Sequence, residues 1–398
     1  MKAGWKTKSL GDVCKVIGGG TPSKDNAEYY SGEIHWATVR DMRSDVITET
    51  ECKITKAAVT SSATNIIPSG NVVIATRVGL GKVCLLGQDT AINQDLRAIV
   101  PINPSDLAVR FLFWWLKSTA DLIVAAGTGA TVQGVKLPFV KSLQIPLPPI
   151  HEQHRIVAIL DEAFDGIAKA RANVEQNRQN ARALFESHLQ SVFTQRGEGW
   201  ISTTLGKATG GIYTGPFGSL LHKSDYVTNG IPLVNPAHIS ATGIEPDMQK
   251  TVSKETAERL SSYIMREGDI VIGRRGEMGR CALVTSVEDG WLCGTGCFFI
   301  KPSERCDSGY LVRFLRSDAC KQRLEKIAGG AVMPNLSNTD LGNLSINLPP
   351  LEQQKTIVGG IKAVAAETQR LESLYQQKLA ALDELKKSLL HQVFSGQL

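Results

Sequence analysis

The segment PLPPIHEQHRIVAILDEAFDGIAKARANVEQNRQNARALFESHLQSVF, from Pro146 to Phe193, has a second copy in the same chain. The second copy, NLPPLEQQKTIVGGIKAVAAETQRLESLYQQKLAALDELKKSLLHQVF, runs from Asn347 to Phe394. The two copies align end to end without an insertion or a deletion. A helix on a protein surface tolerates changes of length, whereas two helices that pack along each other do not. The equal lengths therefore predict two long helices that pair with each other.

Residues three and four positions apart form one stripe along each copy, a spacing typical of a coiled coil or of a helix packed along one long partner. At ~1.5 Å per residue, roughly 40 residues make a rod of about 60 Å. We expect the seam between the helices to contain these residues of the stripe: Ile167, Val174 and Leu184 in the first helix, and Leu371, Tyr375, Leu382, Leu385 and Leu389 in the second.

The segments that precede the two copies are also related. WKTKSLGDV, which starts at Trp5, returns as WISTTLGKA at Trp200. Two β-prone runs joined by TRVGLGK predict a hairpin that ends in glycines and basic residues, and GDIVIGRRGEMGRCALV repeats it with Arg275 in the place of Arg77. The chain is thus a tandem duplication of a globular part and a rod.

The predicted fold class is α+β, with two mixed α/β domains in tandem and each followed by a long helix. The two helices are expected to form an antiparallel coiled coil with pseudo-two-fold symmetry. The expected boundaries are residues 1–148 for the first globular domain, 149–195 for the central helix, 196–349 for the second globular domain and 350–398 for the last helix.

Composition places the chain among ordinary globular proteins, with 398 residues, 42% hydrophobic and 21% charged. No apolar run approaches the ~20 residues that a membrane span requires, and the first ten residues lack an apolar signal region. We therefore expect a cytoplasmic protein with no membrane partner. The eight cysteines form no CxxC pair, which indicates reduced thiols and no metal site.

The net charge of +5 is unevenly distributed. The two long helical segments carry equal numbers of basic and acidic residues, so the globular parts hold the whole excess, most of it in the first. A basic globular part beside neutral helices suits a polyanion that binds the globular faces.

Motifs of known catalytic sites are missing from the sequence. PLPP and NLPP faintly resemble the Asn-Pro-Pro-aromatic motif of amino-methyltransferases, but no aromatic residue follows the prolines, and both tetrads precede a helix. No glycine fingerprint for S-adenosylmethionine, no P-loop and no HExxH arrangement is present. We therefore expect no catalytic residue and no bound cofactor or metal in this chain.

The two glycine-rich basic hairpins are the strongest candidates for contacts with a phosphate backbone, because glycines let backbone N–H groups approach closely and arginines add charge. The alternative is an ordinary tight turn with solvated arginines. Amide side chains suit adenine and arginine suits guanine. The candidate DNA-binding residues are Thr21, Ser23, Lys24, Arg40, Arg77, Lys82, Asn93, Gln94, Phe217, Ser219, Asn235, His238, Arg274, Arg275, Arg280 and Asn335.

Several motifs together resemble one family. These are GGGTPSK at Gly18–Lys24, the YxxGEIxW run at Tyr29–Trp36, the duplicated LPPIHEQHRIV and LPPLEQQKTIV, and the closing SLLHQVFSGQL. The chain resembles, over its whole length, the specificity subunit of type I restriction-modification systems. The second repeat has TGPFGS where the first has the TPSK loop, as expected if the two domains recognise different DNA.

The resemblance implies that each globular part is a target-recognition domain for one half of a bipartite, interrupted site in double-stranded DNA. It implies that the helices set the spacing and dock two methylation subunits, which hold S-adenosylmethionine and methylate adenine. Restriction subunits that act as translocases and nucleases, with ATP and Mg, complete the complex, and this chain is not an enzyme. Two alternatives stay open: a self-contained DNA methyltransferase, and a structural coiled-coil protein without a DNA role.

Overall fold

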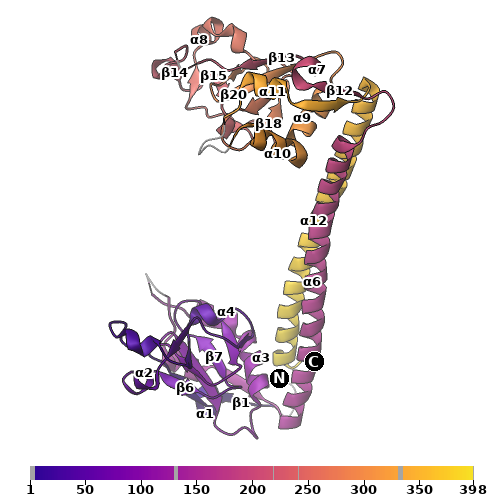
Figure 1. The fold of residues 1–398 in the computed structure, drawn as a ribbon. Coiled ribbons are helices and arrows are strands. Elements are labelled where there is room, and N and C mark those ends of the chain that lie inside the picture. Colours follow the sequence, from indigo (N-terminus) through magenta and orange to yellow (C-terminus); the bar gives the residue numbers. More distant parts are fainter. Residues whose placement is uncertain (1–4, 130–132, 218, 241, 330–334, 398) are drawn as a thin grey trace. The chain divides into compact units, whose positions relative to one another are not determined.

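A computed structural model describes residues 5–129, 133–217, 219–240, 242–329 and 335–397 (Figure 1). The chain divides into two compact units. Unit 1 comprises Met1–Glu175 and Gln376–Leu398, and unit 2 comprises Gln176–Tyr375. The division passes through both long helices, so each helix begins in one unit and ends in the other. The domain boundaries expected from the sequence differ from these units because they assign each long helix to a segment of its own. In the structure, each globular part instead packs against about half of each helix.

Unit 1 contains a five-stranded sheet in the order β2-β10-β7-β8-β4, a four-stranded sheet in the order β5-β3-β9-β6, and the pair β1-β11. Its strands are β1 (Lys6–Ser9), β2 (Cys14–Gly18), β3 (Ile34–Ala37), β4 (Val46–Ile47), β5 (Cys52–Ile54), β6 (Asn65–Ile67), β7 (Val72–Ala75), β8 (Val83–Leu86), β9 (Thr90–Ile92), β10 (Leu96–Pro101) and β11 (Gln144–Leu147). Its short helices are α1 (Leu10–Val13), η1 (Ala27–Tyr30), η2 (Val39–Asp41), α2 (Lys56–Thr60), α3 (Val109–Ser118), α4 (Ala120–Ala125) and α5 (Leu137–Ser142).

Unit 2 repeats this plan with sheets in the orders β13-β20-β17-β18 and β14-β16-β15-β19 and with the pair β12-β21. Its strands are β12 (Ile201–Thr204), β13 (Thr209–Thr214), β14 (Tyr226–Val227), β15 (Ile231–Val234), β16 (Thr251–Val252), β17 (Ile270–Gly273), β18 (Cys281–Leu283), β19 (Leu292–Cys293), β20 (Cys297–Pro302) and β21 (Ser345–Leu348). Its short helices are α7 (Leu205–Ala208), η3 (Lys223–Asp225), η4 (Pro236–His238), α8 (Lys254–Arg259), η5 (Ser261–Tyr263), α9 (Ser308–Arg316), α10 (Asp318–Ile327) and α11 (Asn338–Gly342).

The hairpin strands predicted from the sequence form the centre of each unit. Along β7 successive side chains point to opposite faces, so Val72 and Ile74 join one buried cluster while Val73 and Ala75 join another. In unit 2, Ile270 and Ile272 of β17 join one cluster and Val271 the other. Both central sheets are therefore covered on two faces, which explains why these strands are apolar throughout.

Each long helix starts with a fully buried glutamine. α6 (Ile150–Thr194) and α12 (Leu351–Ser395) are both 45 residues long. The Gln153 amide donates to the carbonyls of Asp106 (2.8 Å) and Pro148 (2.9 Å), and its Oε1 accepts from the amide of Ala108 (2.9 Å). With both side chains fully buried, Gln153 and Gln354 each tie the start of a helix to the globular part that precedes it.

Gln354 makes the equivalent three bonds in unit 2. Its Nε2 donates to the carbonyls of Arg305 (2.8 Å) and Pro349 (2.7 Å), and its Oε1 accepts from the amide of Asp307 (2.8 Å). The glutamine that both copies of the repeated motif share, Gln153 in the first and Gln354 in the second, is therefore a structural residue. Its spacing after the prolines is fixed because one side chain must reach both the helix start and the neighbouring loop.

In each unit the two helical segments lie side by side and run antiparallel (Figure 1). In unit 1, Leu160 shares a cluster with Leu390 and Val393, and Arg171 forms an ion pair with Asp383 at 2.5 Å. Because a higher number in α6 meets a lower number in α12, the direction is antiparallel. Unit 2 agrees, since Arg182 pairs with Glu372 while Phe193 and Val358 share a cluster.

The last phenylalanine of each helix packs into the globular part of the other repeat. Phe394 of α12 meets Phe111 edge to face, with ring centroids 5.3 Å apart. Phe193 of α6 meets Tyr310 and Phe314 at 5.5 and 5.9 Å. The equal helix lengths inferred from the sequence thus correspond to two anchors on each helix, one at its start and one at its end.

The predicted seam is in part wrong. Ile167 and Leu389 pack on the unit 1 core, and Val174, Leu371, Tyr375 and Leu382 are half-buried, but Leu184 is 71% exposed and Leu385 is 47% exposed. The observed stripe passes through the partly buried Phe185 and Leu189 in α6 and through the buried Leu379 and Leu390 in α12. A strict 3.5-residue repeat drifts from the 3.6-residue turn of a straight helix, so the predicted stripe slips by one position.

The buried glutamine can be tested against its neighbour His154, which is exposed. Gln153→Ala leaves three backbone groups without their partner, and each unsatisfied buried group costs ~1–3 kcal/mol. We expect Gln153→Ala to lower the free energy of unfolding by about 3 kcal/mol or more in urea denaturation, and His154→Ala to change it by less than ~0.5 kcal/mol. Equal stability of the two variants would show that the glutamine does not hold the helix.

The position of the seam can be tested with adjacent residues of α6. Phe185→Ala removes a ring that packs on the unit 2 core and should destabilise the chain by roughly 1–3 kcal/mol, less than a fully buried ring. Leu184→Ala should stay within ~0.5 kcal/mol of the wild type, because the side chain is in solvent. Urea denaturation of the two variants decides between the observed seam and the predicted one.

Candidate nucleic-acid interface

Both units carry the same local framework at the end of a pair of parallel strands. In unit 1, β3 runs parallel to β9 and leads into η2, and the amide of Asn93 donates to the carbonyl of Ala37 (3.0 Å). In unit 2, β15 runs parallel to β19 and leads into η4, and the amide of Gly294 donates to the carbonyl of Val234 (2.8 Å). The carboxyl ends of two parallel strands therefore present a short helical turn and a loop next to each other in each unit.

The glycine-rich hairpin packs on this turn in both units. Lys82 Nζ donates to the carbonyl of Val39 (3.4 Å), and Arg280 Nη1 donates to the carbonyl of Pro236 (3.3 Å). These two predicted DNA-binding residues thus occupy equivalent places and hold the hairpin to the turn. Arg280 also bonds to Glu277 (2.5 Å), so part of its charge is already compensated.

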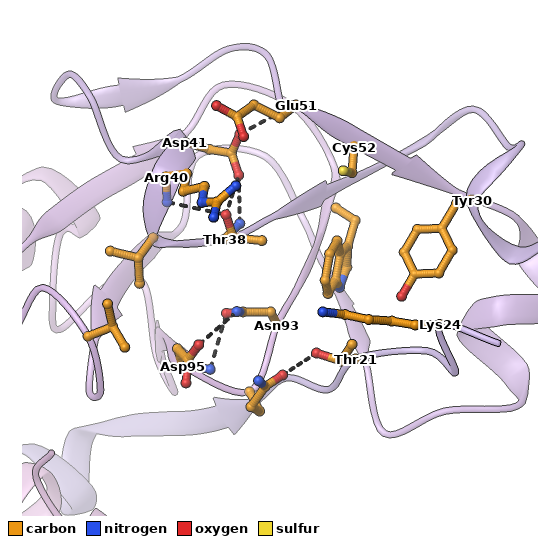
Figure 2. A pocket seen from close by; sticks show the side chains of 14 residues that line it. Thr21, Lys24, Tyr30, Thr38, Arg40, Asp41, Glu51, Cys52, Asn93 and Asp95 are labelled. Carbon is orange, nitrogen blue, oxygen red and sulfur yellow. Dashed lines mark hydrogen bonds between the residues drawn. The ribbon is translucent and has the colours of Figure 1, made fainter. Parts of the chain in front are cut away.

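In unit 1 the turn, the hairpin and the loops at Thr21, Glu51 and Asn93 line an open cavity of about 630 Å³ (Figure 2). Five of the predicted residues line it: Thr21, Lys24, Arg40, Asn93 and Gln94. The other polar and aromatic residues of its lining were not predicted from the sequence; they are Tyr30, Trp36, Thr38, Asp41, Glu51, Cys52 and Asp95. Trp36 is the tryptophan of the YxxGEIxW run, whereas Tyr30 stands at one of its unspecified positions, so the resemblance pointed to Trp36 alone.

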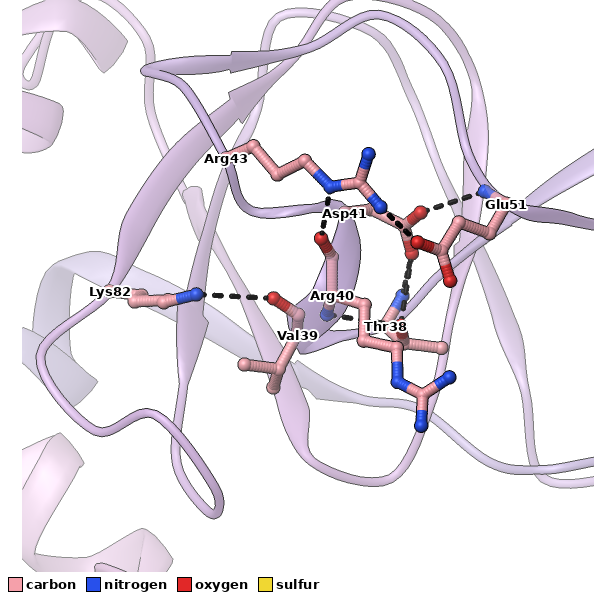
Figure 3. A network of polar contacts seen from close by, with 7 residues as sticks. All are labelled: Thr38, Val39, Arg40, Asp41, Arg43, Glu51 and Lys82. Carbon is pink, nitrogen blue, oxygen red and sulfur yellow. Dashed lines mark hydrogen bonds and ion pairs between the residues drawn. The ribbon is translucent and has the colours of Figure 1, made fainter. Parts of the chain in front are cut away.

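Three carboxylates line the cavity, and all three have partners (Figures 2 and 3). Asp41 accepts bonds from the amide of Thr38 (2.7 Å) and from the amide of Glu51 (2.8 Å). Glu51 forms an ion pair with Arg43, and Asp95 accepts from the side chain of Asn93 (3.1 Å). These contacts hold three carboxylates in the lining, and their negative charge suits the neutral edge of a base better than a phosphate.

Two cations of the cavity are not engaged. Within the described part of the chain, the Lys24 ammonium and the Arg40 guanidinium have no hydrogen-bonding or ionic partner, and both side chains are exposed. They are therefore available to a ligand. Ser23 is exposed beside them but does not line the cavity, and its Oγ accepts from the amide of Asp25 (3.3 Å).

The two amides predicted as base contacts differ in their surroundings. Asn93 is only 6% exposed, and its side chain bonds to the amide and the carboxylate of Asp95 (3.1 Å each). Through these two bonds, the Asn93 side chain stabilises the loop that follows β9. Gln94 is exposed and accepts a bond from the hydroxyl of Thr21, so this pair lies at the surface of the cavity.

Arg77 lies at the start of the hairpin tip, beside the cavity. Its side chain is 54% exposed and forms a long ion pair with Asp95 (3.8 Å). Gly79 and Gly81 have φ values of +75° and +84°, a conformation that glycine adopts without strain. An exposed ion pair of this length contributes little, about 0–1 kcal/mol, so Arg77 is free to exchange Asp95 for a phosphate.

Unit 2 places its arginines at the corresponding hairpin. Arg274 lies 5.5 Å over the ring of Phe298 and donates to the side chain of Asn335 (3.3 Å). Desolvation by burial lowers the pKa of Arg274, and the charge of Arg275 lowers it further. Arg275 is exposed and has no side-chain partner in the described residues. Arg275 therefore matches Arg77 as an accessible cation, whereas Arg274 and Asn335 are engaged with each other.

The remaining predicted residues of unit 2 lie in two places. Phe217 is 58% exposed and Ser219 is exposed, in the loop that follows β13. Asn235 and His238 flank the turn η4, where the amide of Asn235 donates to Nδ1 of His238 (3.2 Å). His238 therefore takes the position of Asp41 in unit 1 and supports the turn in the same way.

The cysteines are free thiols, and all except Cys52 are buried. Burial raises the pKa of Cys281 to about 12 and that of Cys293 well above its ordinary value. These thiols stay protonated at neutral pH, so they behave as small apolar side chains. In the described ranges, no group of three or more histidine, cysteine or carboxylate side chains is arranged to hold a metal ion. Nor is any described helix long and apolar enough to cross a membrane.

Comparisons with known proteins converge on one family. The specificity subunit of the type I restriction enzyme MjaVIII from Methanocaldococcus jannaschii is 23% identical, over 99% of this chain and 93% of that protein. The specificity subunit of EcoR124I/EcoR124II from Escherichia coli is 35% identical over 42% of each chain. This second match spans less than half the length of that relative.

Solved structures show the same fold. The HsdS subunit from Thermoanaerobacter tengcongensis superposes with a TM-score of 0.68 at 22% identity, covering 100% of this chain and 98% of that chain. A chain from a structure of the type I R-M system, described for its complex assembly and conformational transition, gives a TM-score of 0.75 at 21% identity, covering 100% and 99%.

The pattern that defines type I restriction modification DNA specificity domains matches residues 2–176 and 218–380. These two matches cover most of the chain and fall on the two repeats, each of which carries the same turn, hairpin and buried glutamine. The chain therefore belongs to the family of type I restriction modification DNA specificity domains, as a specificity subunit with two tandem recognition domains.

Proposed function

We propose that this chain selects the DNA sequence on which a type I restriction-modification complex acts. Each unit contacts one half of a bipartite, interrupted site in double-stranded DNA. The chain contributes no catalytic residue. The S-adenosylmethionine, ATP and Mg that the complex uses are bound by the methylation and restriction subunits, in the cytoplasm.

The observation that carries the proposal is the duplicated turn and hairpin. In both units a basic side chain of the hairpin bonds to a carbonyl of the turn, and an exposed arginine, Arg77 or Arg275, extends beside it. Two copies of one cationic framework, one in each unit of a duplicated chain, suit two half-sites in a duplex. The cavity beside the turn of unit 1 supplies groups for base edges, while the arginines suit phosphates.

The paired helices suit the proposed roles of spacer and docking site. Each helix is anchored at both ends, so a change in its length shifts one anchor relative to the other. In unit 1 the helix pair also has an apolar hollow of about 330 Å³, lined by Ala170, Val174, Lys378, Ala381, Leu382 and Leu385. An exposed apolar surface of this kind fits a helix of a methylation subunit.

The alternative of a self-contained DNA methyltransferase makes a different prediction for the isolated chain. Under the proposal, the purified chain neither binds S-adenosylmethionine nor methylates DNA, and methylation appears when a methylation subunit is added. The alternative of a structural protein without a DNA role is excluded if the assembled complex binds a duplex with a steep dependence on salt.

The exposed hairpin arginines give a direct test. Arg77→Ala and Arg275→Ala should each weaken duplex binding by the assembled complex and reduce the slope of log K against log salt by about one, as expected for the loss of one phosphate contact. Arg266→Ala is the matched control, because Arg266 is an exposed arginine at the other end of β17 and pairs with Asp289 (3.5 Å). Affinities measured at several salt concentrations that are unchanged in both hairpin variants would show that the hairpins are ordinary turns.

A further inference from the structure

We infer that Arg40 reads a guanine in the half-site bound by unit 1, and that unit 2 makes no guanine contact at the equivalent turn. The inference rests on the proposed function and adds a base preference to one residue. Its evidence is the way the turn η2 holds Arg40, the lack of any partner for its guanidinium, and the residue that replaces it in unit 2.

The turn that carries Arg40 is locked from both sides (Figure 3). Asp41, which is only 8% exposed, accepts from the amide of Thr38 (2.7 Å) and from its hydroxyl (3.0 Å). The hydroxyl of Thr38 accepts from the amide of Arg40 (3.2 Å), and Arg43 Nε donates to the carbonyl of Arg40 (3.0 Å). The backbone of Arg40 is therefore fixed before any ligand binds, which reduces the entropy lost on recognition.

The side chain of Arg40, by contrast, has no bonding partner among the described residues. Figure 3 shows its guanidinium extending away from the bonded side chains of Asp41, Arg43 and Glu51. Within the described residues nothing pairs with it, although it lines the cavity. A guanidinium presents N–H donors in a planar fork that matches the O6 and N7 acceptors of guanine in the major groove.

The neighbours of Arg40 suit a base edge more than a phosphate. Asp41, Glu51 and Asp95 line the same cavity, and their charges would oppose a phosphate placed inside it. The aromatic ring of Tyr30 lies on the opposite part of the lining (Figure 2), and Trp36 also lines the cavity. A base edge brings no net charge into this space.

The equivalent turn of unit 2 lacks the arginine. The bonds from Lys82 to Val39 and from Arg280 to Pro236 align the two turns, so that Ala237 takes the place of Arg40. Ala237 is exposed but offers only a methyl group. A methyl group can contact the C5 methyl of thymine and cannot donate to guanine. One scaffold therefore presents different chemistry in the two half-sites.

The test uses the full chain assembled with its methylation subunits. The preferred site is first selected from random duplexes, and binding is then measured to a set in which each base pair of that site is replaced in turn. Arg40→Ala should lower the preference for guanine at one position by roughly 5- to 150-fold, the loss of one bidentate contact. All positions of the other half-site should keep their preferences, which also shows that the variant is folded.

Arg155→Ala is the control, because it removes the same charge from an exposed arginine of unit 1 that pairs with Glu152 (2.7 Å) and does not line the cavity. It should leave the preference at every position unchanged. If Arg40→Ala keeps every base preference, or weakens binding equally for all sequences, Arg40 is not a reader, while the proposed function stands. If the wild-type complex shows no sequence preference at all, both the inference and the proposed function are wrong.

Discussion

A buried glutamine holds the start of each long helix, and the rest of the architecture depends on that attachment. Gln153 and Gln354 each bond to three backbone groups, two carbonyls and one amide. At the other end of the same helices, Phe193 and Phe394 lie among the aromatic residues of the opposite repeat. A helix fixed at both ends cannot gain or lose residues without breaking an anchor, which explains why the two copies have kept one length.

The globular parts are under a looser constraint. Their central sheets, the turn after the parallel strands and the hairpin that packs on it are the same in both units, whereas the side chains that these elements present differ. Thr38 and Asp41 close the turn in unit 1, and Asn235 and His238 take their positions in unit 2. A shared framework with different side chains suits the proposal that the two domains recognise different DNA sequences.

Much of the fold followed from the sequence, because repeats and periodicity are local signals. The paired helices and the hairpins were predicted, and the antiparallel direction is seen in each unit. The seam was predicted at Leu184, one position before Phe185, which packs on the core. The error arose because a heptad pattern was extended along a helix that has 3.6 residues per turn.

The candidate site was harder to predict. Thr21, Lys24, Arg40, Asn93 and Gln94 come from three separate segments, and only the tertiary fold brings them into one cavity. No local pattern in the sequence indicates that Asn93 is buried and bonds to Asp95. Nor does one indicate that Lys82 donates a hydrogen bond to the carbonyl of Val39. Nor did the sequence distinguish Arg274, which is engaged with Asn335, from the accessible Arg275.

The central claim is that two recognition units in one chain select the two parts of a single DNA site. Sequencing the methylated bases in the genome of a host that carries this chain with its methylation subunits tests it most directly. We expect the methylated adenines of that genome to lie in a motif of two specific parts, separated by a gap of fixed length and arbitrary sequence. A contiguous motif, or a gap whose length varies from site to site, would contradict it.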